Sequence, residues 1–540
     1  MTYCGLTTLS RVASHATVGS EREGSIHSSV HADYDDRLRQ FAAPGACIVT
    51  YVIGLDVGSQ SVKGVLLDPD GNDRASASYA LAMSHPRAGW AEQDPHDWIK
   101  ALTAVIAQLL ATARVRGEEI GVLALACQVD GVVPISAIGE PVGPAILWLD
   151  RRADVEADAL ATNVGRERLF EITGLVPDGS HSGPKIMWLR DHDPDAFASA
   201  AAFPPCAGFL VRFLTGKLVI DHANASSSLL YDLTLRQWSE ELLEASGLRA
   251  EQLGCIMNAS ARAGTLSDYA AAVTGLSTSC SVLVGTGDEH AASLGAGAIT
   301  PGIVTDVTGT AEPVTVASKA LVLDHEGLLE THGHAIDNCY LVENPGFVSG
   351  GSTRWLADNV LHVSHSAIFD LAESAPPGAD GVLFLPALSG ATAPRWNGQM
   401  RGAFAGLAMP HTSANLARAV LEGCAFALRD ITERFRALGL GDEEIRVVGG
   451  GAASETWMQI KADVTGRPVH RVHVAQAAAH GAALLAGVSA GTFKDLNDAV
   501  ARTVTLDDEP FVASPRRAAL YDEAYARYRA LFDGVEGALA

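Results

Sequence analysis

The stretch from Tyr51 to Asp68 carries residue types that could bind a phosphorylated ligand. Two short apolar runs rich in β-branched residues, 51–55 and 65–67, predict paired strands. The tip between them holds Asp56 together with glycine, serine, glutamine and lysine. Glycine lets a backbone approach a ligand closely, successive N–H groups can hold an anion, and an aspartate after a strand can hold Mg²⁺ through water. An ordinary hairpin with a polar turn is the alternative, and this stretch alone does not decide between the two.

A second stretch places an acid where a general base could act. The apolar run 281–284 predicts a strand, and two glycines separate it from Asp288 and Glu289. A carboxylate just past a strand, beside glycines that let a substrate approach, can take a proton from an alcohol. Capping of the following helix is a frequent role for aspartate, and taken alone it is the stronger interpretation of Asp288.

Polar side chains also follow the apolar runs 121–126 and 145–147. These side chains are Gln128, Asp130, Trp148 and Asp150. Ligands of α/β sheets bind at the carboxyl ends of strands, so both strand ends predict a polar small-molecule pocket. The alternative is that each strand simply ends at the solvent.

The segment 303–316 repeats the pattern of the first hairpin. It reads strand, Asp306, then Gly309 and Thr310, then strand, with an offset of one residue from the Asp56 stretch. Such a repeat indicates a duplicated α/β domain that holds one ligand from both sides. Chance similarity of two hairpins is the alternative, because glycine-containing turns are common.

The run 445–448 ends in a glycine turn, 449–451, before a predicted helix that starts near Ser454. A strand, glycines and a helix start suit a nucleotide phosphate, although this is neither the Rossmann fingerprint nor a P-loop. The small-residue helix 476–487 is expected to pack beside this turn.

The apolar stripe of helix 415–438 is interpreted as core, and it comprises Leu416, Val420, Cys424, Leu428, Ile431 and Phe435. His332 and His334 are interpreted as loop residues rather than metal ligands.

The composition restricts the classes of protein to which the chain can belong. At 540 residues it exceeds what one hydrophobic core usually serves, so two domains are expected. A hydrophobic fraction of 48% with 19% charged residues is typical of a folded, soluble protein. The net charge of −24 argues against nucleic acid or an anionic membrane surface as a partner.

Cysteine usage and the absence of targeting patterns favour the cytoplasm. The eight cysteines are scattered without a C-x-x-C pair, which favours reduced thiols over a disulfide framework or a zinc site. No run of 18 apolar residues occurs, so no transmembrane helix is expected. Residues 1–48 show neither sustained periodicity nor a signal-peptide pattern, and we expect a disordered extension or a start codon assigned too early.

Several motifs together carry the pattern of a known family. The segments 180–192 (SHSGPKIMWLRDH) and 402–422 (GAFAGLAMPHTSANLARAVLE) fit that family's two signature patterns over their full length. The shorter motifs are IGLDVGSQSVKG, GWAEQDPHDW, AILWLDRRA, GTGDEHAASLGAGA, GGGAASETWMQIKAD and HGAALLAG. On these motifs, the sequence resembles the FGGY family of carbohydrate kinases, and its xylulokinase-like members in particular, over about residues 51–500.

The resemblance implies an α/β fold of two ribonuclease-H-like domains of the actin and Hsp70 ATPase type. An interdomain cleft would close around ATP and a sugar. The expected boundaries are 1–48 for the extension, 49–297 for the N-terminal domain, 298–500 for the C-terminal domain and 501–540 for a helical tail. The N-terminal domain would hold the sugar site, and the C-terminal domain would hold the adenosine.

The resemblance also assigns roles to residues that match the family's motifs. Asp288 would be the general base, and Asp56 would bind Mg²⁺ through water. The residues facing the phosphates would be Gly58, Ser59, Gln60, Ser61 and Lys63 from one domain and Gly309 and Thr310 from the other. The adenosine site would comprise Gly450, Gly451 and Ser454. The sugar would contact Gln128, Asp130, Trp148, Asp288 and Glu289.

The expected activity is ATP-dependent phosphorylation of a terminal hydroxyl of a small sugar, with a ketopentose such as xylulose as the substrate. A kinase for ribulose or for a polyol of the erythritol type is the alternative within the family, because Val129–Asp130 replaces the Met-His pair usual in xylulokinases. A non-catalytic, actin-like ATP-binding protein is the alternative from another class, although a pure nucleotide switch has no use for a sugar pocket. The sequence does not show the oligomeric state, and a homodimer is the hypothesis to test.

Overall fold

The structure, a computed structural model, describes residues 50–441 and 443–539. The expectation that residues 1–48 form a disordered or misassigned extension lies outside the described residues. All helices and strands with described positions belong to one compact unit, Val49–Ala540.

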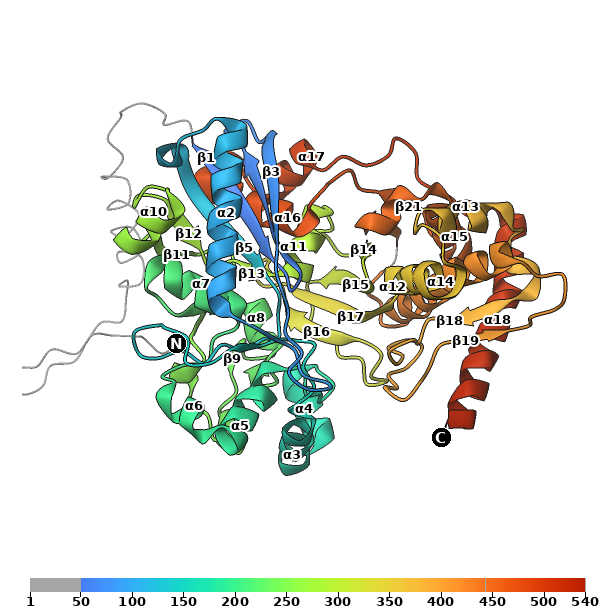
Figure 1. The fold of residues 1–540 in the computed structure, drawn as a ribbon, viewed down its shortest axis with the longest axis horizontal. Helices are drawn as coiled ribbons and strands as arrows, with labels where there is room; N and C mark the ends of the chain where they lie inside the picture. Colours follow the sequence, from blue (N-terminus) through green and yellow to red (C-terminus); the bar gives the residue numbers. More distant parts are fainter. Residues whose placement is uncertain (1–49, 442, 540) are drawn as a thin grey trace, which may run out of the picture. The chain divides into compact units, whose positions relative to one another are not determined.

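The first half of this unit spans residues 51–295, and the second half comprises the residues that follow. A mixed sheet of seven strands lies at the centre of the first half (Figure 1). In spatial order its strands are β11 (Arg262–Thr265), β12 (Ser281–Leu283), β5 (Ile120–Cys127), β1 (Tyr51–Val57), β2 (Ser61–Leu67) and β3 (Asp73–Ala80), with the short β13 (Thr286–Gly287) also paired to β5. Strands β1 and β2 form the predicted antiparallel hairpin, whereas β1 runs parallel to β5. Nearly all residues of β1 and β5 are buried, as expected for apolar strands covered on both faces.

Helix α2 (Pro95–Ala113) packs against β2 and β3 of this sheet. Its N-cap is Asp94, whose side chain accepts a hydrogen bond of 2.9 Å from the backbone N–H of His96. Pro95 occupies the first turn, where a missing N–H costs nothing. The buried face contains the residues that the apolar spacing predicts, namely Trp98, Leu102, Ile106 and Leu109.

The second sheet repeats the topology of the first. Its spatial order is β16 (Glu330–Gly333), β17 (Tyr340–Val348), β15 (Ala311–Ser318), β14 (Ile303–Val307), β20 (Glu444–Val448) and β21 (Val469–Arg471). Here too the opening hairpin is antiparallel, a third strand extends it on one side, and its first strand runs parallel to a later strand. The weak sequence repeat therefore reflects a duplicated α/β unit, and the predicted fold class is confirmed.

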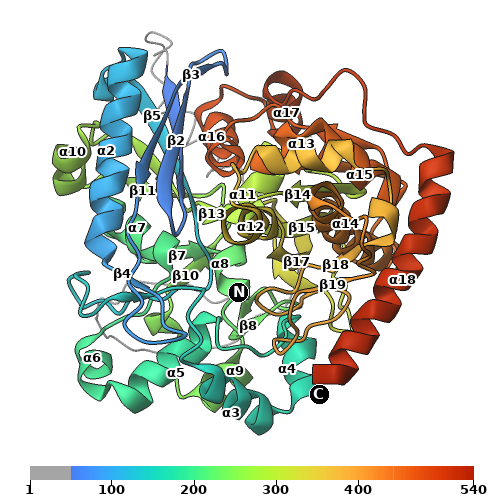
Figure 2. The ribbon, with the colours of Figure 1, turned by 45° about the vertical axis from the view of Figure 1, so that its right-hand side comes forward.

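Helix α16 (Ala477–Ala490) connects the second half of the chain to the first sheet (Figure 2). It packs against β1, β2 and β5 and against helix α11 (Asp288–Gly295). The approach is close, because a β-carbon placed on Gly54 would lie 2.1 Å from the carbonyl oxygen of Ala479. Its main contacts are thus with the first sheet rather than with the glycine turn 449–451, contrary to the expectation.

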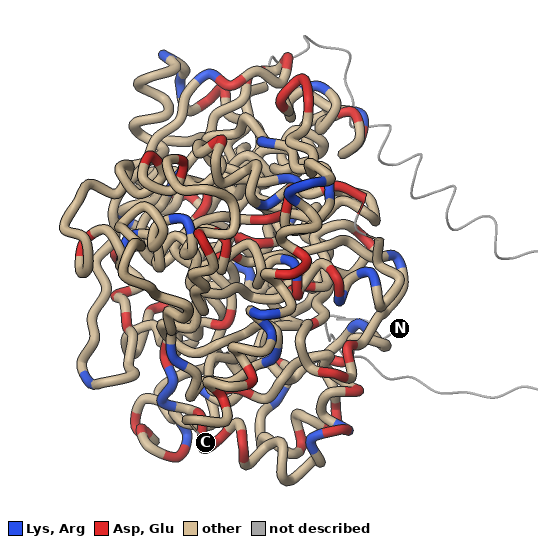
Figure 3. Tube along the Cα trace, turned by 90° about the vertical axis from the view of Figure 1, so that its right-hand side faces the viewer, with Lys and Arg blue, Asp and Glu red and all other residues tan. Residues whose placement is uncertain are grey.

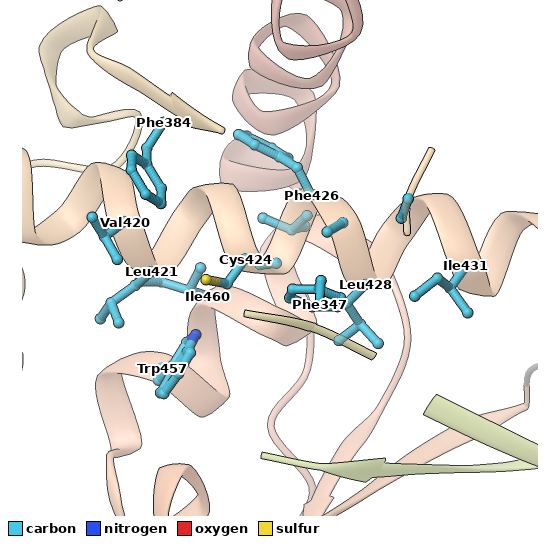
Figure 4. Packing of buried hydrophobic residues seen from close by; sticks show 14 of the residues in the cluster. Phe347, Phe384, Val420, Leu421, Cys424, Phe426, Leu428, Ile431, Trp457 and Ile460 are labelled. Carbon is cyan, nitrogen blue, oxygen red and sulfur yellow. The ribbon is translucent and has the colours of Figure 1, made fainter. Parts of the chain in front are cut away.

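The long helix α14 (Ser413–Ala437) is the centre of the core of the second half (Figure 4). Its stripe is core, as predicted: Leu416 is partly buried, and the fully buried members are Val420, Cys424, Leu428, Ile431 and Phe435. The side chains of Phe384, Trp457 and Ile460 pack around the same helix. The C-terminal helix α18 (Pro515–Leu539) adds Tyr521, Tyr528 and Phe532 to this core.

The other elements surround these two sheets. Those of the first half are the helices α3 (Asp154–Val164), α4 (Arg166–Thr173), α5 (Ser182–His192), α6 (Pro194–Ser199), α7 (Cys206–Thr215), α8 (His222–Ser226), α9 (Glu240–Ser246) and α10 (Asp268–Thr274). Those of the second half are α12 (Gly350–Trp355), α13 (Ala367–Ser374), α15 (Glu455–Thr465) and α17 (Leu496–Thr503). Short sheets pair β4 (Glu92–Gln93) with β6 (Ala145–Ile146), β7 (Val219–Asp221) with β10 (Cys255–Met257), β8 (Tyr231–Asp232) with β9 (Gln237–Trp238) and β18 (Leu383–Leu385) with β19 (Ala403–Ala405).

Charged residues of both signs are interspersed along the described trace (Figure 3). Acidic residues outnumber basic ones in the sequence, 63 to 39. Among the helices with described positions, none combines the length and the apolar character needed to cross a bilayer.

Candidate active site

Three neighbouring strands of the first sheet end at one edge, and a predicted site residue lies at each end. In the register of the sheet, Asp56 on β1 and Thr286 on β13 both pair with Ala126 on β5. Gln128 directly follows β5, and Asp288 directly follows β13. Since parallel strands end at the same edge, the structure brings Asp56, Gln128 and Asp288 together there.

Asp56 keeps one carboxylate oxygen available to a ligand. Its side chain is 10% exposed, and its Oδ2 lies 3.6 Å from Lys63 Nζ. Oδ1 is buried and has no hydrogen-bond partner within the described part of the chain. Burial raises the pKa of Asp56, and the charge of Lys63 opposes that rise. A buried oxygen without a partner fits Mg²⁺, an ion that takes one or two protein carboxylates together with phosphate oxygens.

Asp288 is the first residue of α11 and is not its cap. The N-cap is Gly287, and Asp288 Oδ1 accepts a 3.2 Å hydrogen bond from the backbone N–H of Glu289. Burial raises the pKa of Asp288 to about 7, and the negative charge of Asp56 adds to that rise. The capping interpretation is therefore wrong, because Gly287 holds the cap position. A carboxylate with a pKa near neutral has the proton affinity that a general base needs, and the role of Asp288 as the base stays a prediction.

The turn of the first hairpin and the start of β2 carry the predicted phosphate-facing residues of this half. They are Gly58, Ser59, Gln60, Ser61 and Lys63. The carbonyl oxygen of Ser59 accepts a 2.7 Å hydrogen bond from Gln93 Nε2, and that of Gln60 accepts one of 2.8 Å from the N–H of Leu81. These bonds tie the turn to β4, through Gln93, and to the residue that follows β3, Leu81.

Asp130 stands beyond β5, with the left-handed φ of 62° that aspartate tolerates better than most residues. His181 Nδ1 lies 3.2 Å from Asp130 Oδ1 and 2.8 Å from the carbonyl oxygen of Ser227, while Nε2 lies 3.1 Å from that of Val176. Burial lowers the pKa of His181, but Asp130 and the other acceptors outweigh burial and raise it. The buried Lys185 donates a 2.8 Å hydrogen bond to the carbonyl oxygen of Asp130.

The strand end at 145–147 does not belong to this edge. Strand β6 pairs with β4 in a two-stranded sheet outside the main one. Asp150 is fully buried, and Oδ2 accepts hydrogen bonds of 2.6 Å from the N–H of Ala91 and 2.7 Å from Arg152 Nη2. The interpretation of Asp150 as a pocket residue is therefore wrong, because its carboxylate holds the chain together. Trp148 is 36% exposed, and its contact with a sugar stays a prediction.

A pocket of about 710 Å³ lies in the second half of the unit. Its lining includes all five residues predicted there for ATP, namely Gly309, Thr310, Gly450, Gly451 and Ser454. Ser454 caps helix α15, and its Oγ accepts a 3.2 Å hydrogen bond from the N–H of Trp457. The volume lies within the range of about 300–1,000 Å³ that is usual for small-molecule pockets. The structure thus unites two turns that are far apart in the sequence.

A buried ion network lies directly beneath the turn of the second hairpin. Lys461 Nζ, on α15, donates hydrogen bonds to Asp306 Oδ2 at 2.5 Å, Thr308 Oγ1 at 2.6 Å and Glu312 Oε1 at 3.0 Å. Thr308 Oγ1 in turn donates to Asp306 Oδ1 at 2.9 Å, and Ser349 Oγ donates to Glu312 Oε2. Since Thr308 also lines the pocket, this network ties the turn to the helix that starts at the glycine turn.

Sequence reasoning missed the buried polar residues that support both sites. Three of them stand inside motifs, namely His181, Lys185 and Lys461. A signal existed for Lys461, because it lies four residues after Trp457 and three before Val464, on the same face of the helix. The loop interpretation of His332 is wrong, since it lies on β16; His334 follows that strand, and both side chains are buried.

Comparison with known proteins adds independent evidence. The N-terminal domain of the FGGY family of carbohydrate kinases matches residues 51–295, and its C-terminal domain matches 305–490. The chain is 28% identical to a xylulose kinase of Lactococcus lactis over 488 residues, which are 90% of this chain and 97% of that protein. It is 31% identical to a glycerol kinase of Bordetella parapertussis over 464 residues, which are 83% of this chain and 90% of that protein.

The solved structure of a xylulose kinase from Rhodospirillum rubrum superposes with a TM-score of 0.83 at 29% identity, covering 91% of this chain and 99% of that one. The duplicated α/β fold and these matches place the chain among the carbohydrate kinases. More specifically, it belongs to the FGGY family, as the sequence motifs indicate.

Proposed function

We propose that this chain transfers the γ-phosphoryl group of ATP to a terminal hydroxyl of a small sugar, and that the sugar is a ketopentose such as xylulose. Membership of the FGGY family supports the phosphoryl transfer. The observation that carries the proposal is Asp288 at the sheet edge beside Asp56, with a pKa near 7. The similarity to xylulose kinases supports the choice of a ketopentose.

In the proposed reaction, Asp288 accepts the proton of the substrate hydroxyl as the oxygen attacks phosphorus. Gln128, Asp130, Trp148 and Glu289 orient the sugar so that this hydroxyl faces Asp288. Positioning is a large part of catalysis for phosphoryl transfer, because the transition state demands an aligned acceptor more than covalent help from the protein.

The two hairpins hold the nucleotide from opposite sides. Gly58, Ser59, Gln60, Ser61 and Lys63 face its phosphates from the first half, and Gly309 and Thr310 face them from the second. The adenosine occupies the pocket lined by Gly450, Gly451 and Ser454. Asp56 would hold Mg²⁺, an ion that neutralises charge developing on the phosphates.

A polyol kinase is the second candidate. The observation in its favour is Asp130, which stands where xylulokinases usually carry histidine and accepts hydrogen bonds from hydroxyls without donating one. The 31% identity to a glycerol kinase points the same way. Ribulose and erythritol-type polyols therefore belong in the substrate test.

An ADP-release assay with the purified full chain tests the proposal. The panel contains xylulose, ribulose, erythritol, pentitols and glycerol, each with Mg²⁺ and ATP, and mass spectrometry identifies the phosphorylated product. We expect one ketopentose or polyol to give ADP and sugar phosphate in equal amounts. ATP binding without any phosphorylated product from the panel would contradict the proposal and favour a non-catalytic, actin-like role.

Two further expectations accompany this proposal. We infer a cytoplasmic location from the scattered cysteines of the sequence. A homodimer remains the hypothesis for the assembly, and sedimentation of the purified chain would test it.

A further inference from the structure

The edge strand of the second sheet lies against residues of the first half. The N–H of Gly333 on β16 donates a 2.9 Å hydrogen bond to Ser226 Oγ at the end of α8. The N–H of Val176 donates one of 3.1 Å to Glu330 Oε1 on the same strand. Side chains of β16 and of its neighbour β17 can therefore reach residues that surround the sheet edge.

Four titratable side chains from the two halves gather here, and we call Asp130, Glu289, His332 and Glu343 the acid–imidazole cluster. Glu343 Oε1 lies 3.2 Å from His332 Nε2, and both residues share a face of the β16–β17 pair. The ring of His332 lies 5.9 Å from that of His290, the residue after Glu289. Burial raises the pKa of Glu289, and the charges of Glu343, Asp288 and Asp130 each add to that rise.

The cluster contains buried polar atoms whose hydrogen bonds are incomplete. The side chains of His332 and Glu343 are each 5% exposed. Within residues 50–441 and 443–539, no hydrogen-bond partner reaches Glu289 Oε2, Glu343 Oε2 or His332 Nδ1. Buried polar atoms are nearly always paired in folded proteins, since leaving one unpaired costs free energy. Several unpaired atoms beside a proposed substrate pocket therefore point to a ligand that completes them.

We propose that the acid–imidazole cluster is the far wall of the sugar pocket, where Glu343 and His332 hydrogen-bond hydroxyl groups of an uncharged polyhydroxylated substrate and exclude sugar acids. This inference rests on the proposed function and narrows its substrate class. Carboxylates accept hydrogen bonds from hydroxyls, and an imidazole can accept one or donate one.

The charges around the cluster explain the exclusion of sugar acids. A substrate carboxylate would lie beside Asp130, Glu289 and Glu343, whose mutual repulsion already disfavours negative charge there. The nearby basic groups already have partners, because His332 faces Glu343, His181 faces Asp130 and Lys185 donates to backbone carbonyl oxygens. A neutral hydroxyl carries no such penalty.

Wild-type protein with matched substrates tests the exclusion directly. Ribitol is compared with ribonate and arabinitol with arabinonate, beside the ketopentoses, and kcat/KM is measured for each. We expect roughly 100-fold or greater preference for the neutral member of any pair that reacts, and for the ketopentoses over both acids. Equal rates for a sugar acid and its neutral partner would overturn this inference while leaving the proposed kinase activity intact. No turnover of any compound would instead refute the proposed function, and this inference with it.

The variants Glu343→Gln and His332→Asn test the two side chains. Each should raise the KM of the neutral substrate by roughly 10- to 100-fold, as expected for a lost hydrogen bond to a charged group, and leave the KM of ATP unchanged. Glu343→Gln should also narrow the discrimination against the matched sugar acid. The matched control is Glu156→Gln, because Glu156 is a buried glutamate that pairs with His192 at 3.0 Å on other helices. Unchanged sugar KM in a folded variant, or equal changes in the KM of sugar and ATP, would overturn the inference; if neither variant folds, the wild-type comparison decides.

Discussion

The two hairpins that open the two halves have the same local pattern, but their aspartates lie in different environments. Asp56, in the first hairpin, is 10% exposed, and its neighbour Lys63 is 40% exposed at a distance of 3.6 Å. Asp306, in the second hairpin, is fully buried 2.5 Å from Lys461, whose side chain is 1% exposed. One carboxylate keeps an oxygen that has no hydrogen-bond partner among the described residues, whereas both oxygens of the other are bonded inside the protein.

This difference shows that a repeated sequence pattern fixes backbone shape more firmly than it fixes the role of a residue. Both aspartates lie near the end of a strand that runs parallel to a later strand of its sheet. What separates them is tertiary: α15 inserts a lysine beneath the second hairpin, while Asp56 instead lies near Asp288. We therefore assign chemistry to the first hairpin and positioning of the nucleotide to the second.

The largest expected effect comes from Asp288, which lies beside the first hairpin. Asp288→Ala should lower kcat by roughly 10²–10⁴-fold, because the acceptor hydroxyl loses its base. The affinity for ATP, measured by calorimetry, should stay nearly constant, since the pocket that we propose for the nucleotide lies in the second half. Asp268→Ala is the matched control, because Asp268 is likewise the first residue of its helix, α10, and is exposed. Unchanged sugar phosphorylation by Asp288→Ala would refute the assigned base.

Exchanging each hairpin aspartate for asparagine tests the comparison itself. Asp56→Asn should lower kcat by roughly 10²–10³-fold through lost stabilisation of the phosphates, with little change in the free energy of unfolding. Asp306→Asn should instead cost about 3–5 kcal/mol of stability, because it breaks a buried ion pair. Denaturant titration and steady-state kinetics on both variants separate the two effects. Similar losses of activity and stability in both variants would contradict the distinction drawn here.

A smaller effect is expected from Lys461, which bonds Asp306, Thr308 and Glu312 beneath the second hairpin and would position the nucleotide through it. Burial raises the pKa of Glu312 to about 7, and Asp306 adds to the rise while Lys461 opposes it. Lys461→Met should therefore shift the turn at Thr308 and raise the KM of ATP by roughly tenfold, with a smaller change in the KM of sugar. The double variant Lys461→Met with Glu312→Gln should recover part of the stability that Lys461→Met alone loses. Equal changes in both KM values would argue against a positioning role.

An effect of a different kind concerns the pH dependence of stability. The pKa of Asp288 is raised to about 7 in the folded state, above its usual value of 3.8, so the folded state holds a proton that the unfolded state releases. Stability is lost on this account as the pH rises from about 4 through 7. Asp288→Asn removes the effect. Relative to wild type, the variant should therefore be more stable at pH 8 than at pH 5, when stability is measured as the free energy of unfolding. A constant difference between the two pH values would contradict the raised pKa.

The sequence supports the fold well, because local and tertiary preferences agree there. Asp94 and Pro95 mark the start of α2, and the spacing of Val420, Cys424 and Leu428 marks the buried face of α14. The sequence could not predict that α16 packs on the first sheet, because a helix of small residues can pack closely against many surfaces. Which surface α16 contacts depends on how the two sheets are arranged in space, and the linear pattern does not show this arrangement.

The candidate site could be predicted where a strand end carries the residue and not where a distant segment supplies it. Asp56 lies near the end of its strand, Gln128 and Asp288 directly follow theirs, and all three lie at one edge of the sheet. Asp150 also follows an apolar run, but Arg152 uses its carboxylate, and nothing in a linear pattern shows such a pairing. Glu343 reaches the cluster only because the second sheet docks on the first half.

The most direct test of the account is a crystal structure of the protein with a non-hydrolysable ATP analogue, Mn²⁺ and the substrate found in the panel. We predict that the acceptor hydroxyl lies about 2.6–3.2 Å from an oxygen of Asp288, with Mn²⁺ on the Asp56 side and the adenine beside Gly450. A hydroxyl held instead by another acid, with Asp288 turned away from the substrate, would contradict the assignment of Asp288 as the base.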